Sequence, residues 1–131
     1  MWLKQPMEKT FLKVENIRAY SVASELGALI WEIVAKWSFF EKKTIGSQYV
    51  NCIDSIAANI AEGFGRFHKK DKEKFYYNAR GSLYEAIHWT EKAFERKLLT
   101  NAEYSDIKEK LTSLPKEINW LIKITEEKLT I

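Results

Sequence analysis

Apolar residues recur at intervals of three and four along most of the chain, the spacing that places them on one face of an α-helix. The first such stretch predicts a helix over residues 17–37, with Asn16 in position to cap its N-terminus. Its apolar positions are Val22, Leu26, Leu29, Ile30, Ile33 and Trp37. Residues 1–15 show no consistent period, so we expect an N-terminal arm over 1–15 and a single domain over 16–131.

A second helix is predicted over residues 44–64, after a short polar link over 38–43. Its apolar positions are Ile45, Tyr49, Cys52, Ile53, Ile56, Ile60 and Phe64. Gly63 and Gly65 are expected to end this helix, because glycine adopts the left-handed conformation at a helix C-terminus without steric cost.

Two further helices are predicted in the second half of the chain. The third spans residues 69–97, with an inner stripe of Phe75, Tyr76, Ala79, Leu83, Ala86, Ile87, Ala93 and Phe94. The fourth begins at a capping box over 100–103, where threonine and glutamate side chains each accept from a free backbone N–H, and its apolar stripe continues to Leu129. Pro115 lacks a backbone donor, so we expect either a kink there or a break, with Ser113 capping the second half.

Short links between four helices require each helix to run antiparallel to the one before it, because a short loop cannot cross the length of a bundle. The predicted fold is therefore all-α, an antiparallel up-down-up-down four-helix bundle. The composition agrees: 46% of the 131 residues are hydrophobic, and five glycines with two prolines are too few for an all-β protein.

The remaining composition excludes several classes of protein. A single cysteine, Cys52, excludes an internal disulfide and a zinc site made of several cysteines, and it is expected to be buried in the second helix. No run of 18 apolar residues occurs and the first 20 residues carry charges throughout, so we expect neither a membrane span nor a signal peptide, and a cytoplasmic protein.

Candidate catalytic and metal-binding residues are sparse. Glu85 and His88 have the Glu-x-x-His spacing of di-metal helical bundles, but the second histidine, His68, has Gly65 three positions before it. No serine, cysteine or carboxylate is grouped with a histidine as nucleophile and base. We therefore predict no catalytic residue, no metal site and no cofactor, and a protein that is not an enzyme.

Positive charge is concentrated in residues 66–74. This segment contains five of the 21 basic residues and two of the 18 acidic ones, so it alone accounts for the net charge of +3. Such a cluster can be a solvated loop, or it can bind phosphate beside the free N–H groups of the third helix, with Phe67 and Phe75 available for stacking. The candidate nucleic-acid-binding residues are Arg66, His68, Lys69, Lys70, Lys72 and Lys74. The side chains of Lys69, Lys70 and Lys72 are expected to point into solvent.

Aromatic residues make up 14% of the chain, and Trp31, Trp89 and Trp120 fall outside the apolar stripes. They either thicken the core or form second apolar faces that pack against other copies of the chain, and the second interpretation is favoured. The chain is therefore expected to form a homo-oligomer. The alternative to nucleic-acid binding is a structural oligomer that binds only a protein partner.

The segment over residues 55–66, Ser-Ile-Ala-Ala-Asn-Ile-Ala-Glu-Gly-Phe-Gly-Arg, and the segment over 75–85 resemble the signature of the 23S rRNA intervening-sequence proteins, also called four-helix bundle proteins. The resemblance implies an antiparallel bundle that assembles as a homopentamer. A related branch, accessory proteins of diversity-generating retroelements, is strongly basic and binds nucleic acid; a net charge of +3 argues against that branch. The signature residues that could form a polar network are Ser55, Asn59, Glu62, Arg66, Ser82 and Glu85.

Two positions depart from the family pattern. His68 stands where the family usually has a serine that caps the third helix, so a weaker cap is expected. Phe40 stands before Glu41 where a proline is common.

Overall fold

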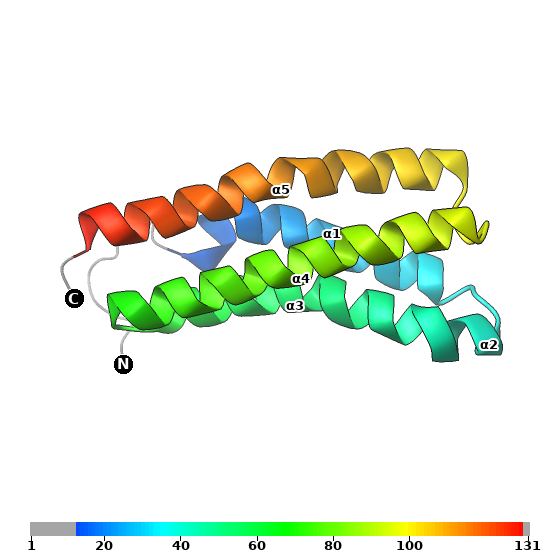
Figure 1. The fold of residues 1–131 in the computed structure, drawn as a ribbon, viewed down its shortest axis with the longest axis horizontal. Coiled ribbons are helices and arrows are strands. Elements are labelled where there is room, and N and C mark those ends of the chain that lie inside the picture. The colour runs from blue at the N-terminus through cyan, green and yellow to red at the C-terminus, as the bar shows by residue number, and fades with distance from the viewer. Residues whose placement is uncertain (1–12, 130–131) are drawn as a thin grey trace.

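The computed structural model describes residues 13–129, and these form an all-α bundle with no strand in that range. Four long helices run antiparallel to one another, with adjacent helices in the sequence lying side by side (Figure 1). In chain order the elements are η1 (Val14–Asn16), α1 (Arg18–Val34), α2 (Phe39–Glu41), η2 (Lys42–Gly46), α3 (Ser47–Gly65), α4 (Lys69–Glu95) and α5 (Asn101–Lys128). The predicted four-helix bundle is confirmed.

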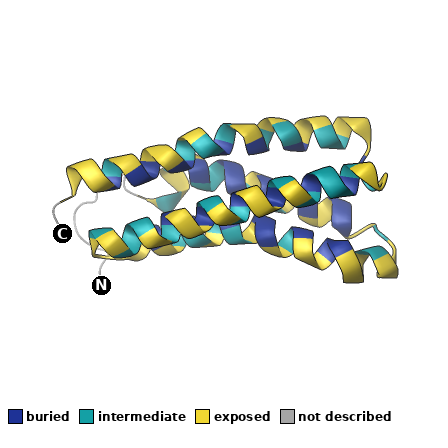
Figure 2. Ribbon diagram, viewed as in Figure 1, coloured by how far each residue is buried: buried dark blue, intermediate teal, exposed yellow. Residues whose placement is uncertain are grey.

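The core is a column of aliphatic side chains contributed by all four long helices, and the buried positions face inward along each of them (Figure 2). The fully buried members include Leu26, Ile30, Ile53, Ile56, Ile60, Leu83, Ile107, Leu111, Leu114 and Ile118. All of these residues belong to the predicted stripes. Their burial removes apolar side chains from water, which is the main favourable contribution to folding. The stripe of α5 ends at the buried Thr125, since Leu129 is exposed.

Two helix starts differ from those predicted. Ile17 occupies the cap position of α1 and Asn16 lies in the short helix η1, so the predicted Asn16 cap is wrong. The predicted polar link over 38–43 is largely helical: Ser38 and Glu41 form a capping box, and η2 leads directly into α3. The predicted capping box at Thr100 and Glu103 is confirmed, and the two boxes have the same spacing.

The prediction that a glycine in the left-handed conformation ends α3 is also wrong. Neither Gly63 nor Gly65 has a positive φ, and α3 ends because Arg66 turns to an extended conformation. Gly63 is required for another reason: a Cβ there would lie 2.7 Å from a ring carbon of Tyr76. The left-handed position is Lys97, with φ 63°, just after α4.

Helix α5 continues through Pro115 without interruption from Asn101 to Lys128, so the alternative of a break is excluded. Ser113 caps no second helix, because its hydroxyl donates to the carbonyl of Lys110 at 2.8 Å. Of the N-terminal arm expected over 1–15, residues 1–12 lie outside the described part of the chain, and Val14 and Glu15 belong to η1.

Candidate nucleic-acid interface

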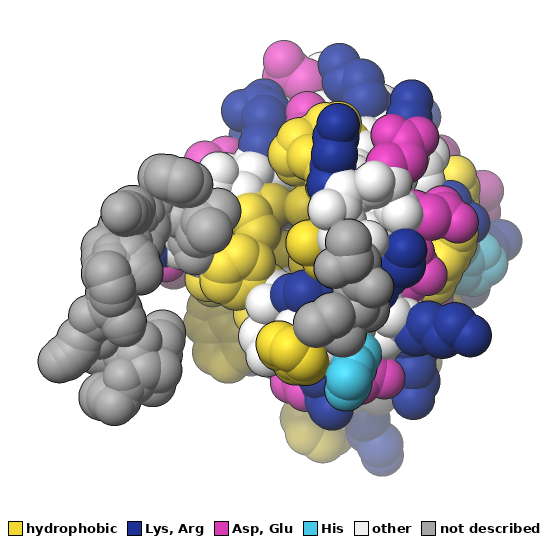
Figure 3. Space-filling view, turned by 90° about the vertical axis from the view of Figure 1, so that its left-hand side faces the viewer, with side chains coloured by type: hydrophobic (Ala, Val, Ile, Leu, Met, Phe, Trp, Pro, Cys, Tyr) yellow, Lys and Arg dark blue, Asp and Glu magenta, His cyan; other side chains and the backbone are white. Residues whose placement is uncertain are grey.

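The basic segment lies at the end of the bundle where α3 stops and α4 begins. Figure 3 views the molecule from this end, where Lys and Arg side chains, with Asp and Glu side chains between them, lie around exposed hydrophobic and histidine side chains. The antiparallel arrangement brings the last turns of α3 and α5 to the same end as the first turn of α4 (Figure 1). Two C-termini, each with unpaired carbonyls, therefore lie beside the lysines of α4.

Two of these lysines are bound to helix C-termini. The amino group of Lys72 donates to the carbonyls of Phe64 at 2.9 Å and Gly63 at 3.4 Å, in the last turn of α3. The amino group of Lys69 donates to the carbonyls of Glu126 and Leu129 at 3.1 and 3.3 Å, at the end of α5. The expectation that these two side chains point freely into solvent is wrong.

The energetic reason is the sign of the helix dipole. A cation is unfavourable at the N-terminus of its own helix but favourable at the C-terminus of a neighbour, where backbone carbonyls accumulate negative partial charge. Lys72 is also half-buried, and this desolvation lowers the pKa of its amino group. Its carbonyl partners provide hydrogen bonds that replace those lost from water.

Arg66 and Lys74 both contact the ring of Phe75. The guanidinium of Arg66 is 4.7 Å from the ring centroid, and the amino group of Lys74 is 5.6 Å from it. Arg66 also forms an ion pair with Glu62 at 2.6 Å, and both side chains remain about half exposed. These contacts orient the two cations while leaving them accessible.

Lys70 and His68 complete the positive surface. Lys70 is exposed and makes no hydrogen bond or ion pair with any residue between 13 and 129. His68 occupies the cap position of α4 without a side-chain cap bond, as its substitution for serine predicts, and packs edge-on against Phe67. Phe67 is 70% exposed. We call Arg66, Phe67, His68, Lys70 and Lys74 the junction cluster.

The expected polar network is divided into three separate groups. Ser55 and Ser82 share a hydrogen bond of 2.9 Å between α3 and α4, and the amide of Asn59 donates to Ser55. Glu62 pairs with Arg66 one turn later, and Glu85 accepts from the indole of Trp89. The serine–asparagine group therefore joins two helices, which is a structural role.

Other candidate chemistry has no support in the described chain. Residues 13–129 contain no group of three side chains suited to a metal ion, and none of their helices is long and apolar enough to cross a membrane. His88 is exposed beside Trp89. Cys52 is buried, its thiol donates to the carbonyl of Tyr49, and burial raises its pKa to about 12, so it is no nucleophile at neutral pH.

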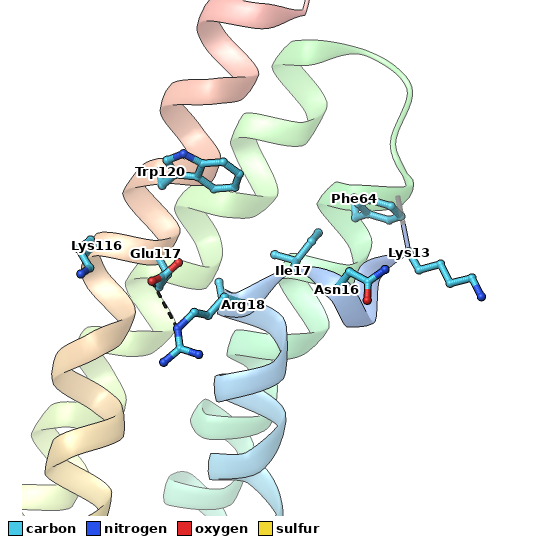
Figure 4. A pocket seen from close by; sticks show the side chains of 9 residues that line it. Lys13, Asn16, Ile17, Arg18, Phe64, Lys116, Glu117 and Trp120 are labelled. Atoms are coloured by element: carbon cyan, nitrogen blue, oxygen red, sulfur yellow. Dashed lines mark ion pairs between the residues drawn. The ribbon is translucent and has the colours of Figure 1, made fainter. Parts of the chain in front are cut away.

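Sequence reasoning missed a pocket at the same end of the bundle. It has a volume of about 520 Å³ and lies where η1 and the start of α1 meet α5 and the end of α3 (Figure 4). Trp120 of α5 and Phe64 of α3 contribute aromatic walls, and Glu117 pairs with Arg18 across it at 3.6 Å. The sequence feature that could have indicated this pocket is Trp120, a large aromatic residue outside the apolar stripe of its helix.

Comparisons with known proteins agree with this architecture. A protein of unknown function from Bacteroides thetaiotaomicron, described as a member of the S23 ribosomal protein family, has a similar solved structure, with a TM-score of 0.68 and 20% sequence identity. The match covers 82% of this chain and 97% of that one, and at this identity it shows the fold alone. No curated protein matches the chain. The model of the 23S rRNA-intervening sequence protein family matches residues 15–120, which span nearly all of the bundle, and the chain therefore belongs to that family.

Proposed function

We propose that this protein is a non-enzymatic homo-oligomer that binds RNA or DNA through the junction cluster. The observation that carries the proposal is the combination of exposed cations and an exposed aromatic ring at one end of the bundle. Lys70 has no competing partner in the described chain, and Phe67 beside it is 70% exposed. Cations bind phosphates regardless of sequence, and aromatic rings stack on bases of any kind.

Self-association is supported by the aromatic side chains on the outer faces of the helices. Trp31 is 61% exposed, and Tyr77 and Tyr84 lie one above the other on α4 with the small Gly81 between them. Large exposed aromatic residues mark interfaces, because their burial removes much apolar surface from water. Five subunits are expected from the family resemblance, and a ring would repeat the junction cluster and raise avidity.

Binding to nucleic acid is tested by its dependence on salt. The affinity for a labelled RNA should fall steeply with increasing salt, and the variant with Lys70→Gln and Lys74→Gln should bind weakly across sequences. The matched control carries Lys36→Gln and Lys42→Gln, two exposed lysines at the opposite end of the bundle. The slope of log affinity against log salt should decrease by about two for the junction variant only.

Self-association is tested by light scattering at micromolar concentration. A mass near five times 15.4 kDa is expected. A mass of one chain would contradict the proposed oligomer, and a dimer would contradict the number five.

A second candidate function is protein binding without nucleic acid. It is favoured by an apolar area at the far end of the bundle, where Phe39 and Phe40 of α2 are 78% and 72% exposed. A pocket of about 390 Å³ lies between α1 and α3 at that end, lined in part by Trp31, Val34 and Val50. The absence of salt-sensitive nucleic-acid binding in the wild-type protein would establish this candidate as the better one.

A further inference from the structure

We propose that the pocket between α1 and α5 receives one unpaired nucleobase of a single strand, which gives the protein a preference for single-stranded over double-stranded nucleic acid. This inference rests on the proposed function and adds a second, base-contacting site to it. The pocket volume of about 520 Å³ lies within the range of ordinary small-ligand sites.

The pocket presents a flat aromatic wall. The indole of Trp120 projects from α5 over the space in front of Ile17 and Phe64 (Figure 4). Trp120 is 54% exposed although it borders a pocket, so much of its surface is available to another ring. A nucleobase has the shape and polarisability to stack there, and such stacking tolerates any base.

Polar groups at the rim match the rest of a nucleotide. Arg18, Lys13 and Lys116 contribute three positive charges and Glu117 one negative charge, a balance that suits a phosphate. The Glu117 carboxylate is mostly covered, and its ion pair with Arg18 is long at 3.6 Å. As an acceptor without a hydrogen, it suits the exocyclic amino group of cytosine and opposes the carbonyl oxygen of uracil.

The pocket lies close to the junction cluster, because Phe64 in its lining is two residues before Arg66. The ring of Phe64 lines the pocket, while its backbone carbonyl accepts the hydrogen bond from Lys72 in the first turn of α4. A strand whose phosphates contact Lys70 therefore has a route over the same end of the bundle to Trp120. Bases in a duplex are stacked on both faces and paired along their edges, so only an unpaired base can enter.

The test compares a labelled twelve-nucleotide cytidine strand with the same strand annealed to its complement, using the full chain at low salt. The wild type should bind the single strand more tightly. Trp120→Leu should weaken single-strand binding by about tenfold or more and leave duplex binding unchanged. Phe40→Leu is the control, since this exposed aromatic residue lies in α2 at the opposite end of the bundle, and it should change neither affinity.

The role of Glu117 is tested by base preference. The wild type should bind the cytidine strand about tenfold more tightly than a uridine strand, because cytosine directs an amino group at the carboxylate where uracil directs a carbonyl oxygen. Glu117→Gln should remove this preference, since an amide both donates and accepts. A merely structural role for Glu117 would lower stability without changing the ratio of the two affinities.

The outcomes separate this inference from the proposed function. Equal binding of single strand and duplex, with Trp120→Leu behaving as Phe40→Leu, overturns the pocket site and leaves the junction cluster as the binding surface. Equal affinity for cytidine and uridine strands overturns the assigned role of Glu117. Undetectable salt-sensitive binding to either form overturns both proposals.

Discussion

The amino group of Lys72 donates a hydrogen bond of 2.9 Å to the carbonyl of Phe64, so the first turn of one helix closes the last turn of the helix before it. The two residues are separated by a loop and a reversal of chain direction. A lysine that opposes the dipole of α4 thereby stabilises the opposite pole of α3. This contact makes Lys72 part of the fold, although it lies within the most basic segment of the chain.

Replacing Lys72 with methionine keeps the apolar stem and removes the charge and the donors. We expect a loss of about 1–2 kcal/mol in the free energy of unfolding, because two carbonyls at the end of α3 lose a charged donor. Lys70→Met is the control and should be nearly neutral, since Lys70 makes no hydrogen bond in the described chain. Urea denaturation measures both, and equal midpoints would show that the contact contributes nothing.

Gly63→Ala should destabilise the protein by about 1–3 kcal/mol, because the added methyl group overlaps the Tyr76 ring and lies 3.1 Å from the carbonyl of Lys72. Gly81→Ala is the matched control: it adds the same group to a helix interior where nothing lies within 4 Å. There the better helix propensity of alanine should add up to about 1 kcal/mol to the stability. Thermal unfolding should show a lower melting temperature for Gly63→Ala and a higher one for Gly81→Ala. A Gly63→Ala variant as stable as the wild type would contradict the close approach.

Tyr49 and Thr90 form a buried hydroxyl pair with a defined direction. The Thr90 hydroxyl donates to the carbonyl of Ala86 at 2.8 Å, so Tyr49 donates to Thr90 at 2.7 Å. Thr90→Val should cost about 1–3 kcal/mol because it leaves the tyrosine hydroxyl unpaired, whereas Tyr49→Phe should cost less because Thr90 keeps its bond to Ala86. Chemical denaturation of the single and double variants checks this asymmetry, and the reverse order would contradict the assigned donor.

Ile56→Asp should be severely destabilising, by about 4 kcal/mol or more, because it places an unpaired carboxylate at a fully buried position of the core. Ala58→Asp introduces the same charge on the exposed side of α3 and should change stability by less than about 0.5 kcal/mol. Circular dichroism during heating compares the two. A wild-type melting temperature for Ile56→Asp would show that the inner face of α3 is assigned wrongly.

The buried thiol of Cys52 should make the stability of the protein depend on pH in the alkaline range. Burial raises the thiol pKa from 9.0 to about 12 in the folded protein, so between these values the unfolded chain loses the proton first. The unfolded state is then favoured, and stability should fall as the pH rises above about 9. Cys52→Ala should show a shallower fall than the wild type in urea titrations between pH 8 and 10.5, and parallel curves would contradict the buried thiol.

The sequence by itself determined the helices, their core faces and the family. Stripes such as the one through Ile107, Leu111, Leu114 and Ile118 depend only on the period of the helix, and every one of these residues is buried. The capping box at Thr100 and Glu103 is equally local, because both partners lie within one turn. Ser38 and Glu41 carry the same signal, so the early start of the second helix was readable as well.

Tertiary structure alone decided what the polar and small residues do. Lys69 reaches α5 almost sixty residues away, Gly63 makes room for a ring of the next helix, and Trp120 meets residues from η1, α1 and α3 at a pocket. A lysine looks the same in sequence whether its amino group faces water or a helix C-terminus. Its role depends on which helix end lies beside it, and that is set only when the four apolar stripes pack together and bring distant turns to the same end of the bundle.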